Sequence, residues 1–205
     1  AGADQAQKVL ILADALESSA PSEVDSKTVM TCLTAKSISR DVYVTAELLD
    51  RKYENYLKTA MCDEILFSRD FARRMIANSS ATNGMSHIIY ELLTRQHSHS
   101  RLVTREIPDE YQGGVWSDFR EQNPDTDDRL ILGILENTGS ANRMKIEALR
   151  EAQKTSDVSK LVANLQAVKG LETNRPLLLP PADHVIQKYD LLIVLERAST
   201  EVARG

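Results

Sequence analysis

The side chains of this sequence that could do chemistry are scattered carboxylates and histidines, and no motif marks a catalytic nucleophile. The chain has no G-x-S-x-G turn, no phosphate-binding P-loop and no Cys-x-x-Cys pair. His97 and His99 would face the same side of a strand and could share a metal. No third ligand is evident beside them, so an exposed linker is the alternative. The pattern favours a protein that is not an enzyme.

Negative charge gathers in the loop that precedes the first predicted helix and in the start of that helix. Glu17, Glu23 and Asp25 all lie there. Such a group of carboxylates would raise the local cation concentration even without a defined site. The alternative is an ordinary solvated loop, since loops are usually polar.

Composition and charge exclude several classes of function. The chain has 205 residues, with 25 basic and 30 acidic side chains and a net charge of −5. It therefore offers no basic stripe for nucleic acid or for anionic lipid. The longest apolar stretches, Val9 to Ala13 and Leu130 to Leu135, are far shorter than the roughly 20 residues of a membrane helix. Cys32 and Cys62 fit a reducing cytoplasm better than a disulfide scaffold.

The first third of the chain alternates short apolar runs with helical periodicity, which indicates α/β construction. Val9 to Leu12, Val42 to Ala46 and Ile65 to Phe67 are predicted to be buried strands. Ser26 is placed to cap the first intervening helix, and residues 53–61 have helical spacing. The β-α-β-α-β order predicts parallel strands with right-handed crossovers, which is half of a doubly wound sheet.

Two successive amphipathic helices are predicted between Asp70 and Arg95, with a turn at Asn83-Gly84. Two interpretations stay open, because these helices could cover their own sheet or could pack against another copy of the chain. The apolar positions that define the two faces are Phe71, Met75 and Ile76 in the first helix and Met85, Ile88, Ile89, Leu92 and Leu93 in the second.

A second lobe is predicted from Arg101 onward. Leu102 to Ile107, Leu130 to Leu135 and Leu191 to Leu195 have the pattern of strands, and Val115 to Glu121 that of a short helix. This order predicts an α+β lobe with a small antiparallel or mixed sheet.

A helical hairpin is predicted inside that lobe, over residues 141–171. Thr155-Ser156-Asp157 would cap its second helix, and Gly170 would end it. We interpret the hairpin as a packing or contact element.

Three segments together resemble a known family. Val9 to Met61 is similar to the second half of a Rossmann-like subdomain, with Ala60 to Leu66 as its helix end, turn and strand start. Phe71 to Thr94 resembles a helix-turn-helix that exchanges across a dimer. Pro176 to Leu195, the most specific segment, is similar to the motif that closes a C-terminal subdomain. The family is the regulator of potassium conductance (RCK) family, the TrkA-N/TrkA-C-like cytoplasmic domain of prokaryotic potassium channels.

The resemblance implies an α/β fold with a partial Rossmann-like parallel sheet, a helix-turn-helix crossover and a smaller α+β C-terminal lobe with an inserted helical hairpin. The expected divisions are residues 1–70, 71–100 and 101–205, with the insertion at 141–171. Family members normally begin with a strand and a G-x-G-x-x-G turn, which this sequence lacks. We therefore expect an N-terminally truncated form, in which a nucleotide site is not demonstrable.

Calcium is the cofactor that the resemblance implies. In calcium-gated members of the family, acidic residues after successive strands collect Ca²⁺, and the corresponding positions are Asp14 and Glu47, with Asp50 replacing a second glutamate. The carboxyl ends of adjacent parallel strands converge on one edge, and Ca²⁺ prefers oxygen ligands. The alternative is that these carboxylates are solvated or cap helices.

The implied function is a ligand-sensing gating domain on the cytoplasmic side of the cell membrane, which couples an ion or a nucleotide to the opening of a potassium channel. A peripheral regulatory subunit of a potassium uptake transporter is the alternative, and half of a nucleotide-dependent oxidoreductase is a third reading that lacks its glycine fingerprint. Expected partners are a second copy, in a homodimer that builds an octameric ring, and a pore domain, without nucleic acid or membrane insertion. The expected dimer interface consists of Phe71, Met75, Met85, Ile88, Ile89, Leu92 and Leu93.

Overall fold

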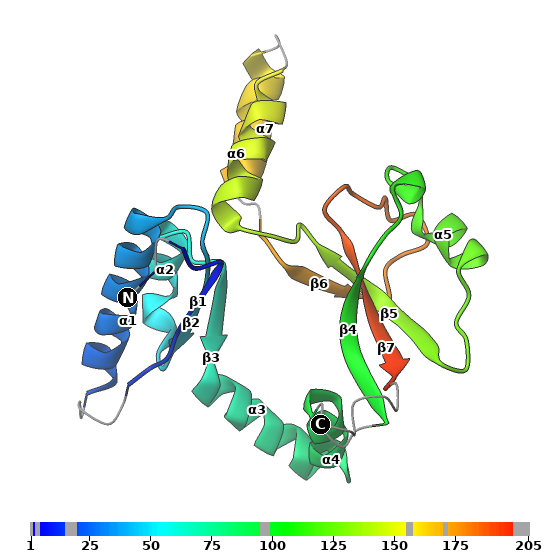
Figure 1. Ribbon diagram of the computed structural model, residues 1–205, viewed down its shortest axis with the longest axis horizontal. Coiled ribbons are helices and arrows are strands. Elements are labelled where there is room, and N and C mark those ends of the chain that lie inside the picture. Colours follow the sequence, from blue (N-terminus) through cyan, green and yellow to red (C-terminus); the bar gives the residue numbers. More distant parts are fainter. Residues whose placement is uncertain are drawn as a thin grey trace. The chain divides into compact units, whose positions relative to one another are not determined.

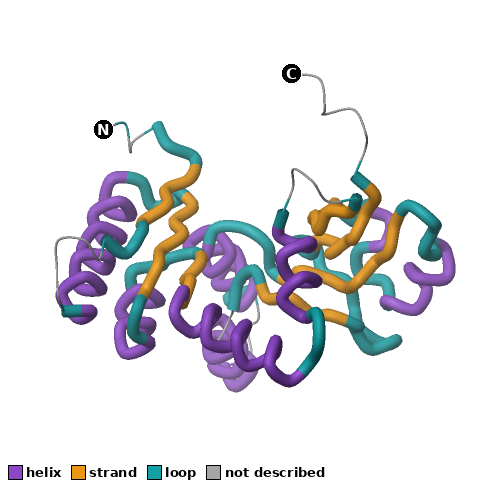
Figure 2. The backbone as a smooth tube through the Cα atoms, turned by 90° about the horizontal axis from the view of Figure 1, so that it is seen from below, coloured by secondary structure: helices purple, strands orange, loops and turns teal. Residues whose placement is uncertain are grey.

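The computed structural model describes residues 2, 5–14, 20–94, 99–154, 158–169 and 172–198. The chain divides into two compact units (Figure 1). Unit 1 comprises residues 1–73 and 139–173, and unit 2 comprises residues 74–138 and 174–205. Each unit has its own sheet, and Figure 2 draws the strands of both in orange. None of the helices among the described residues is long and apolar enough to cross a membrane.

Unit 1 contains a parallel sheet of three strands. They are β1 (Lys8–Ile11), β2 (Tyr43–Leu48) and β3 (Glu64–Phe67), in the order β1-β2-β3. Val9 pairs with Val44 and Ala46 pairs with Ile65, both in parallel register. The predicted α/β construction with parallel strands is therefore confirmed.

The helices of unit 1 bury one face of this sheet. They are α1 (Pro21–Ile38), the short 3-10 helix η1 (Arg51–Tyr53) and α2 (Glu54–Thr59). Alternate residues of β2 are buried, as expected for a sheet with one well-covered face. The core that forms there consists of Ile11, Val29, Cys32, Ala35, Val42, Val44, Ala46, Leu48, Leu57, Ala60 and Cys62.

The start of α1 differs from the prediction. The helix begins at Pro21, whose fixed φ suits the first helical position, and not at Ser26. Ser26 lies inside the helix, where its hydroxyl donates a hydrogen bond to the carbonyl oxygen of Ser22. The predicted cap was therefore wrong, because proline supplies the start signal one and a half turns earlier.

The second face of the unit 1 sheet stays partly open. Leu10 on β1 and Leu66 on β3 are 61% and 43% exposed. Their neighbours on β2 are Thr45 and Glu47, which are only half-buried. Parallel sheets are usually covered on both faces, so this sheet has half of the usual covering within the described residues.

Two helices follow β3, and neither buries a residue. They are α3 (Ser68–Ala81) and α4 (Met85–Leu93), separated by a turn in which Gly84 has a φ of +80°. The interpretation in which these helices cover their own sheet is wrong, since a covering helix would bury an apolar stripe. The boundary between the two units falls within α3, after Arg73.

Unit 2 is built on an antiparallel sheet of four strands. They are β4 (Ser100–Glu106), β5 (Arg129–Glu136), β6 (Arg175–Leu178) and β7 (Leu191–Arg197), in the order β4-β7-β5-β6. The 3-10 helix η2 (Asp109–Tyr111) and the helix α5 (Trp116–Gln122) follow β4. The core consists of Ile107, Trp116, Phe119, Ile131, Ile134, Ile186, Leu192 and Val194.

The predicted hairpin forms α6 (Ala141–Ala152) and α7 (Val158–Lys169), which lie side by side (Figure 1). Although strands of unit 2 flank the hairpin in the sequence, it belongs to unit 1. The predicted cap at residues 155–157 and the predicted stop at Gly170 lie outside the described residues.

Candidate functional site

The first two predicted metal ligands lie where β1 and β2 approach their carboxyl ends. Glu47 is the penultimate residue of β2, one step earlier than the prediction of a position just beyond the strand. Its Oε2 accepts a hydrogen bond of 2.9 Å from the backbone N–H of Ala13. Asp14 follows Ala13 and has an exposed side chain. The parallel pairing of the two strands therefore brings Asp14 close in sequence to the contact that Glu47 makes.

Asp50, the third predicted ligand, caps η1. Its Oδ1 accepts a hydrogen bond of 3.0 Å from the backbone N–H of Lys52, and its Oδ2 lies 3.3 Å from the Lys52 ammonium. The backbone hydrogen bond, together with that ammonium, lowers the pKa of Asp50. These contacts correspond to the alternative in which the carboxylate caps a helix.

Asp25 has a structural role that the sequence did not reveal. It lies within α1, is fully buried, and accepts hydrogen bonds of 2.9 Å from the backbone N–H groups of Leu49 and Asp50. One carboxylate thus satisfies two backbone donors where the chain leaves β2. Asp25 is therefore not one of the solvated loop charges that the sequence predicted.

These carboxylates fit a calcium ion only in part. Ca²⁺ takes about six to eight oxygen ligands, and Asp14 and Glu47 offer oxygens of the right kind, whereas Asp50 is already held by Lys52. No three His, Cys, Asp or Glu side chains gather into a possible metal site anywhere in the described ranges. His99 is exposed, and His97 lies outside the described residues. The calcium site stays a prediction.

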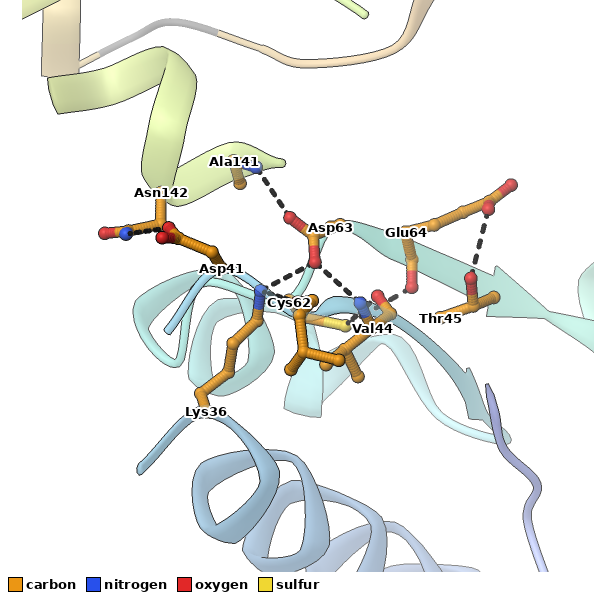
Figure 3. A network of polar contacts seen from close by, with 10 residues as sticks. Lys36, Asp41, Val44, Thr45, Cys62, Asp63, Glu64, Ala141 and Asn142 are labelled. Carbon is orange, nitrogen blue, oxygen red and sulfur yellow. Dashed lines mark hydrogen bonds and ion pairs between the residues drawn. The ribbon is translucent and has the colours of Figure 1, made fainter. Parts of the chain in front are cut away.

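A buried polar centre lies near the other end of the same sheet, just before β3. The Asp63 carboxylate is fully buried, and its Oδ2 accepts hydrogen bonds of 2.6 Å from the Lys36 ammonium and 2.6 Å from the backbone N–H of Val44 (Figure 3). Its Oδ1 accepts a third, also of 2.6 Å, from the backbone N–H of Ala141. One side chain therefore joins α1, β2 and the first residue of α6.

Further contacts complete this centre. The Lys36 ammonium also donates to the carbonyl oxygen of Val42 at 2.8 Å. The Asn142 amide donates to Asp41 at 3.1 Å, on the exposed side of the same junction (Figure 3). A carboxylate at the first residue of a helix satisfies a free N–H and interacts favourably with the helix dipole. The centre therefore fixes the start of α6 on the sheet of unit 1.

Sequence reasoning missed this centre. The segment around Asp63 was matched only as a turn and a strand start, and Ala141 lies 78 residues further along the chain. No local pattern marks such a long-range contact. A buried lysine in an otherwise apolar stripe of α1 was the one available signal, since lysine is almost never fully buried without a partner.

The predicted interface residues all lie on the open helices α3 and α4. Phe71, Ile88 and Leu93 are 55%, 54% and 63% exposed. The other four predicted positions, Met75, Met85, Ile89 and Leu92, are half-buried. The structure therefore brings these side chains to the surface, and the dimer interface stays a prediction.

The fold of this chain has counterparts among solved structures, although no protein-family model and no curated protein matches its sequence. The human SLO3 gating ring is similar over 94% of this chain, with a TM-score of 0.57 and 15% sequence identity. The match covers 33% of the SLO3 chain, so this chain spans about a third of its length.

Two structures of GsuK have much lower scores. The GsuK channel bound to NAD matches 96% of this chain and 26% of its own, with 12% identity and a TM-score of 0.34. The GsuK RCK domain matches 95% of this chain and 31% of its own, with 13% identity and a TM-score of 0.28. Scores at this level carry no argument, and the gating ring alone carries the likeness. The chain has an RCK-like fold, with a parallel α/β unit and a separate antiparallel unit.

Proposed function

We propose that this chain is a ligand-sensing gating domain of a potassium channel, on the cytoplasmic side of the membrane, and that it works as a dimer built through α3 and α4. The observation that carries the proposal is the open apolar surface of these two helices, on a chain with the fold of a gating-ring domain. Dimers would then assemble into an octameric ring beneath a pore domain.

The energetic argument starts from the exposed side chains. Burying one large apolar side chain contributes about 1.5–3 kcal/mol, and α3 and α4 leave Phe71, Ile88 and Leu93 more than half exposed. A second copy that presents the same surface would cover them with two-fold symmetry. A larger exposed apolar patch of this kind is typical of an interaction site.

Gating would follow from a shift in populations. The chain passes from unit 1 to unit 2 within α3, so a dimer held by α3 and α4 would keep the junctions of both copies together. An effector can change the equilibrium between two arrangements of the units only if it binds one of them more tightly. The linker to the pore would then transmit that change.

Replacing both Ile89 and Leu92 with glutamate tests the interface. We expect a monomer by light scattering, with a dissociation constant raised about 100-fold or more, because facing like charges cost several kcal/mol. Glu91→Lys is the matched control, since Glu91 is an exposed charge on the same helix, and it should leave the dimer intact. A double glutamate variant that keeps the dimer mass would rule out this interface.

Calorimetric titration with Ca²⁺ tests the ligand. Asp14→Asn and Glu47→Gln should each weaken binding about tenfold, which corresponds to about 1.4 kcal/mol, because each removes one charged oxygen ligand. Asp118→Asn, an exposed carboxylate of α5, is the control and should bind as the wild type does. If Ca²⁺ binds equally well to both site variants, the effector lies elsewhere, and titration with nucleotides is the next arm.

A further inference from the structure

The only two cysteines of the chain meet in the core of unit 1. Cys32 lies on the face of α1 that packs on the sheet, and Cys62 lies between α2 and β3. Both are free, and they are 0% and 7% exposed. They belong to the same buried cluster.

The two thiols contact each other directly, with a hydrogen bond between them. The Cys62 sulfur also lies 3.4 Å from the carbonyl oxygen of Val44 and 3.3 Å from that of Glu64. Backbone atoms of β2 and β3 therefore hold the Cys62 side chain in place beside Cys32.

The surroundings make the two thiols unequal. The hydrogen bond from Cys62 lowers the pKa of Cys32, and the nearby Lys36 ammonium acts in the same direction. The same hydrogen bond, together with burial, raises the pKa of Cys62. A thiolate is the reactive form in oxidation and in exchange, so Cys32 is the nucleophile of the pair and Cys62 is the resolving thiol.

A simpler reading treats both residues as small apolar side chains that fill the core, where free cysteine is common. That reading requires no contact between the sulfur atoms and no difference between the thiols. Two sulfurs brought together from α1 and from the start of β3, in a chain without further cysteines, instead satisfy the first requirement of a disulfide, which is proximity.

We propose that Cys32 and Cys62 form a reversible intramolecular disulfide when a peroxide oxidises the protein. The Cys32 thiolate attacks one oxygen of hydrogen peroxide, which forms a sulfenic acid and releases hydroxide. The Cys62 sulfur then attacks the Cys32 sulfur, the S–O bond breaks, and the hydroxyl leaves as water with the Cys62 proton. Two thiols and one peroxide thus give one disulfide and two waters.

The bond would lie beside the polar centre that holds the hairpin. Cys62 directly precedes Asp63, whose carboxylate contacts Lys36 of α1 and Ala141 of α6. A disulfide would tie α1 covalently to the start of β3 and would restrict local opening of that region. Because both thiols are buried, the oxidant reaches them through such opening, and the reaction should be slower than at an exposed thiol.

Oxidation of the whole chain with hydrogen peroxide tests the proposal. We expect the intact mass to fall by two hydrogen atoms, both thiols to become unreactive in denaturant, and a digest to contain one peptide that links Cys32 to Cys62. Dithiothreitol should restore the mass and both thiols. The oxidised chain should also melt at a higher temperature than the reduced chain.

Single variants separate this site from general oxidation. Cys32→Ser and Cys62→Ser should each gain oxygen or stay unchanged, and neither should lose two hydrogen atoms. The melting comparison on the wild-type chain needs no variant, so it remains valid if a serine variant does not fold. Two titratable thiols after oxidation, sulfinic acid without a linked peptide, or only disulfides between chains would each overturn the proposal.

Discussion

Replacing Asp63 with alanine is expected to lower the free energy of unfolding of unit 1 by about 3–5 kcal/mol, because it leaves the buried Lys36 ammonium without its partner. The backbone N–H groups of Val44 and Ala141 would lose their acceptor as well. Urea unfolding followed by far-ultraviolet circular dichroism measures the loss. Trp116, the single tryptophan, lies in unit 2, so its fluorescence follows the other unit separately.

A second variant decides whether charge is the cause. Lys36→Met combined with Asp63→Asn removes both charges, and it should be more stable than Asp63→Ala, because a neutral pair needs no compensation in a buried site. The asparagine oxygen can still accept one of the two backbone N–H bonds. If Asp63→Ala and the double variant lose the same stability, the ion pair is not what the centre contributes.

The same substitution should loosen the start of the hairpin. Hydrogen exchange of the first turn of α6 should become faster in Asp63→Ala, since the Ala141 N–H loses its acceptor. Asp41→Ala is the matched control, because Asp41 contacts Asn142 at the same junction from an exposed position. An exposed hydrogen bond of this kind contributes about 0.5–1.5 kcal/mol, and exchange in this control should change less.

Patterns of apolar residues were sufficient to predict the strands of unit 1 and the two open helices. The runs beginning at Val9, Val42 and Ile65 correspond to β1, β2 and β3 within one or two residues. A buried parallel strand has few alternatives, because a short apolar run between helices must lie in a sheet. The start of α1 was predicted wrongly at Ser26, because Pro21 was assigned to a loop although proline favours the first helical turn.

Strand β6 was not predicted, and Pro176 explains why. Proline lacks an N–H and is usually excluded from strands, except at the edge of a sheet. β6 is an edge strand that pairs only with β5 in the described sheet, where Pro176 lies opposite Leu135. The sequence alone does not reveal which strand will be at the edge, so proline argued against a strand that exists.

The candidate site shows the same limit. Carboxylates at strand ends could be placed from the sequence, because the ends of parallel strands converge. Their partners could not, since Asp25 contacts Leu49 and Asp63 contacts Ala141 across 24 and 78 residues of sequence. A charge that saturates backbone donors and a charge that is free to bind an ion look alike in a sequence. The buried donors around each one distinguish them.

Gly133→Ala is expected to cost about 3 kcal/mol, at the upper end of the usual range for overpacking a closely packed site. A Cβ atom at this position would lie 2.2 Å from the carbonyl oxygen of Leu177 and 2.9 Å from the Cα of Leu178. Both neighbours are backbone atoms of β6, so no flexible side chain can move aside. Gly133 also adjoins the irregularity in the pairing of β5 with β7, and glycine at a bulge permits a close approach of this kind.

Two measurements separate this clash from the general cost of adding a methyl group. Fluorescence of Trp116 during urea unfolding should report the full loss, because β5 supplies Ile131 and Ile134 to the core that contains this tryptophan. Gly84→Ala is the control, since its added Cβ would meet nothing within 4 Å and only the φ of +80° opposes it, a cost of about 1–2 kcal/mol. Equal losses in the two variants would mean that β6 can move away from β5, and that the close approach at Gly133 does not hold the sheet together.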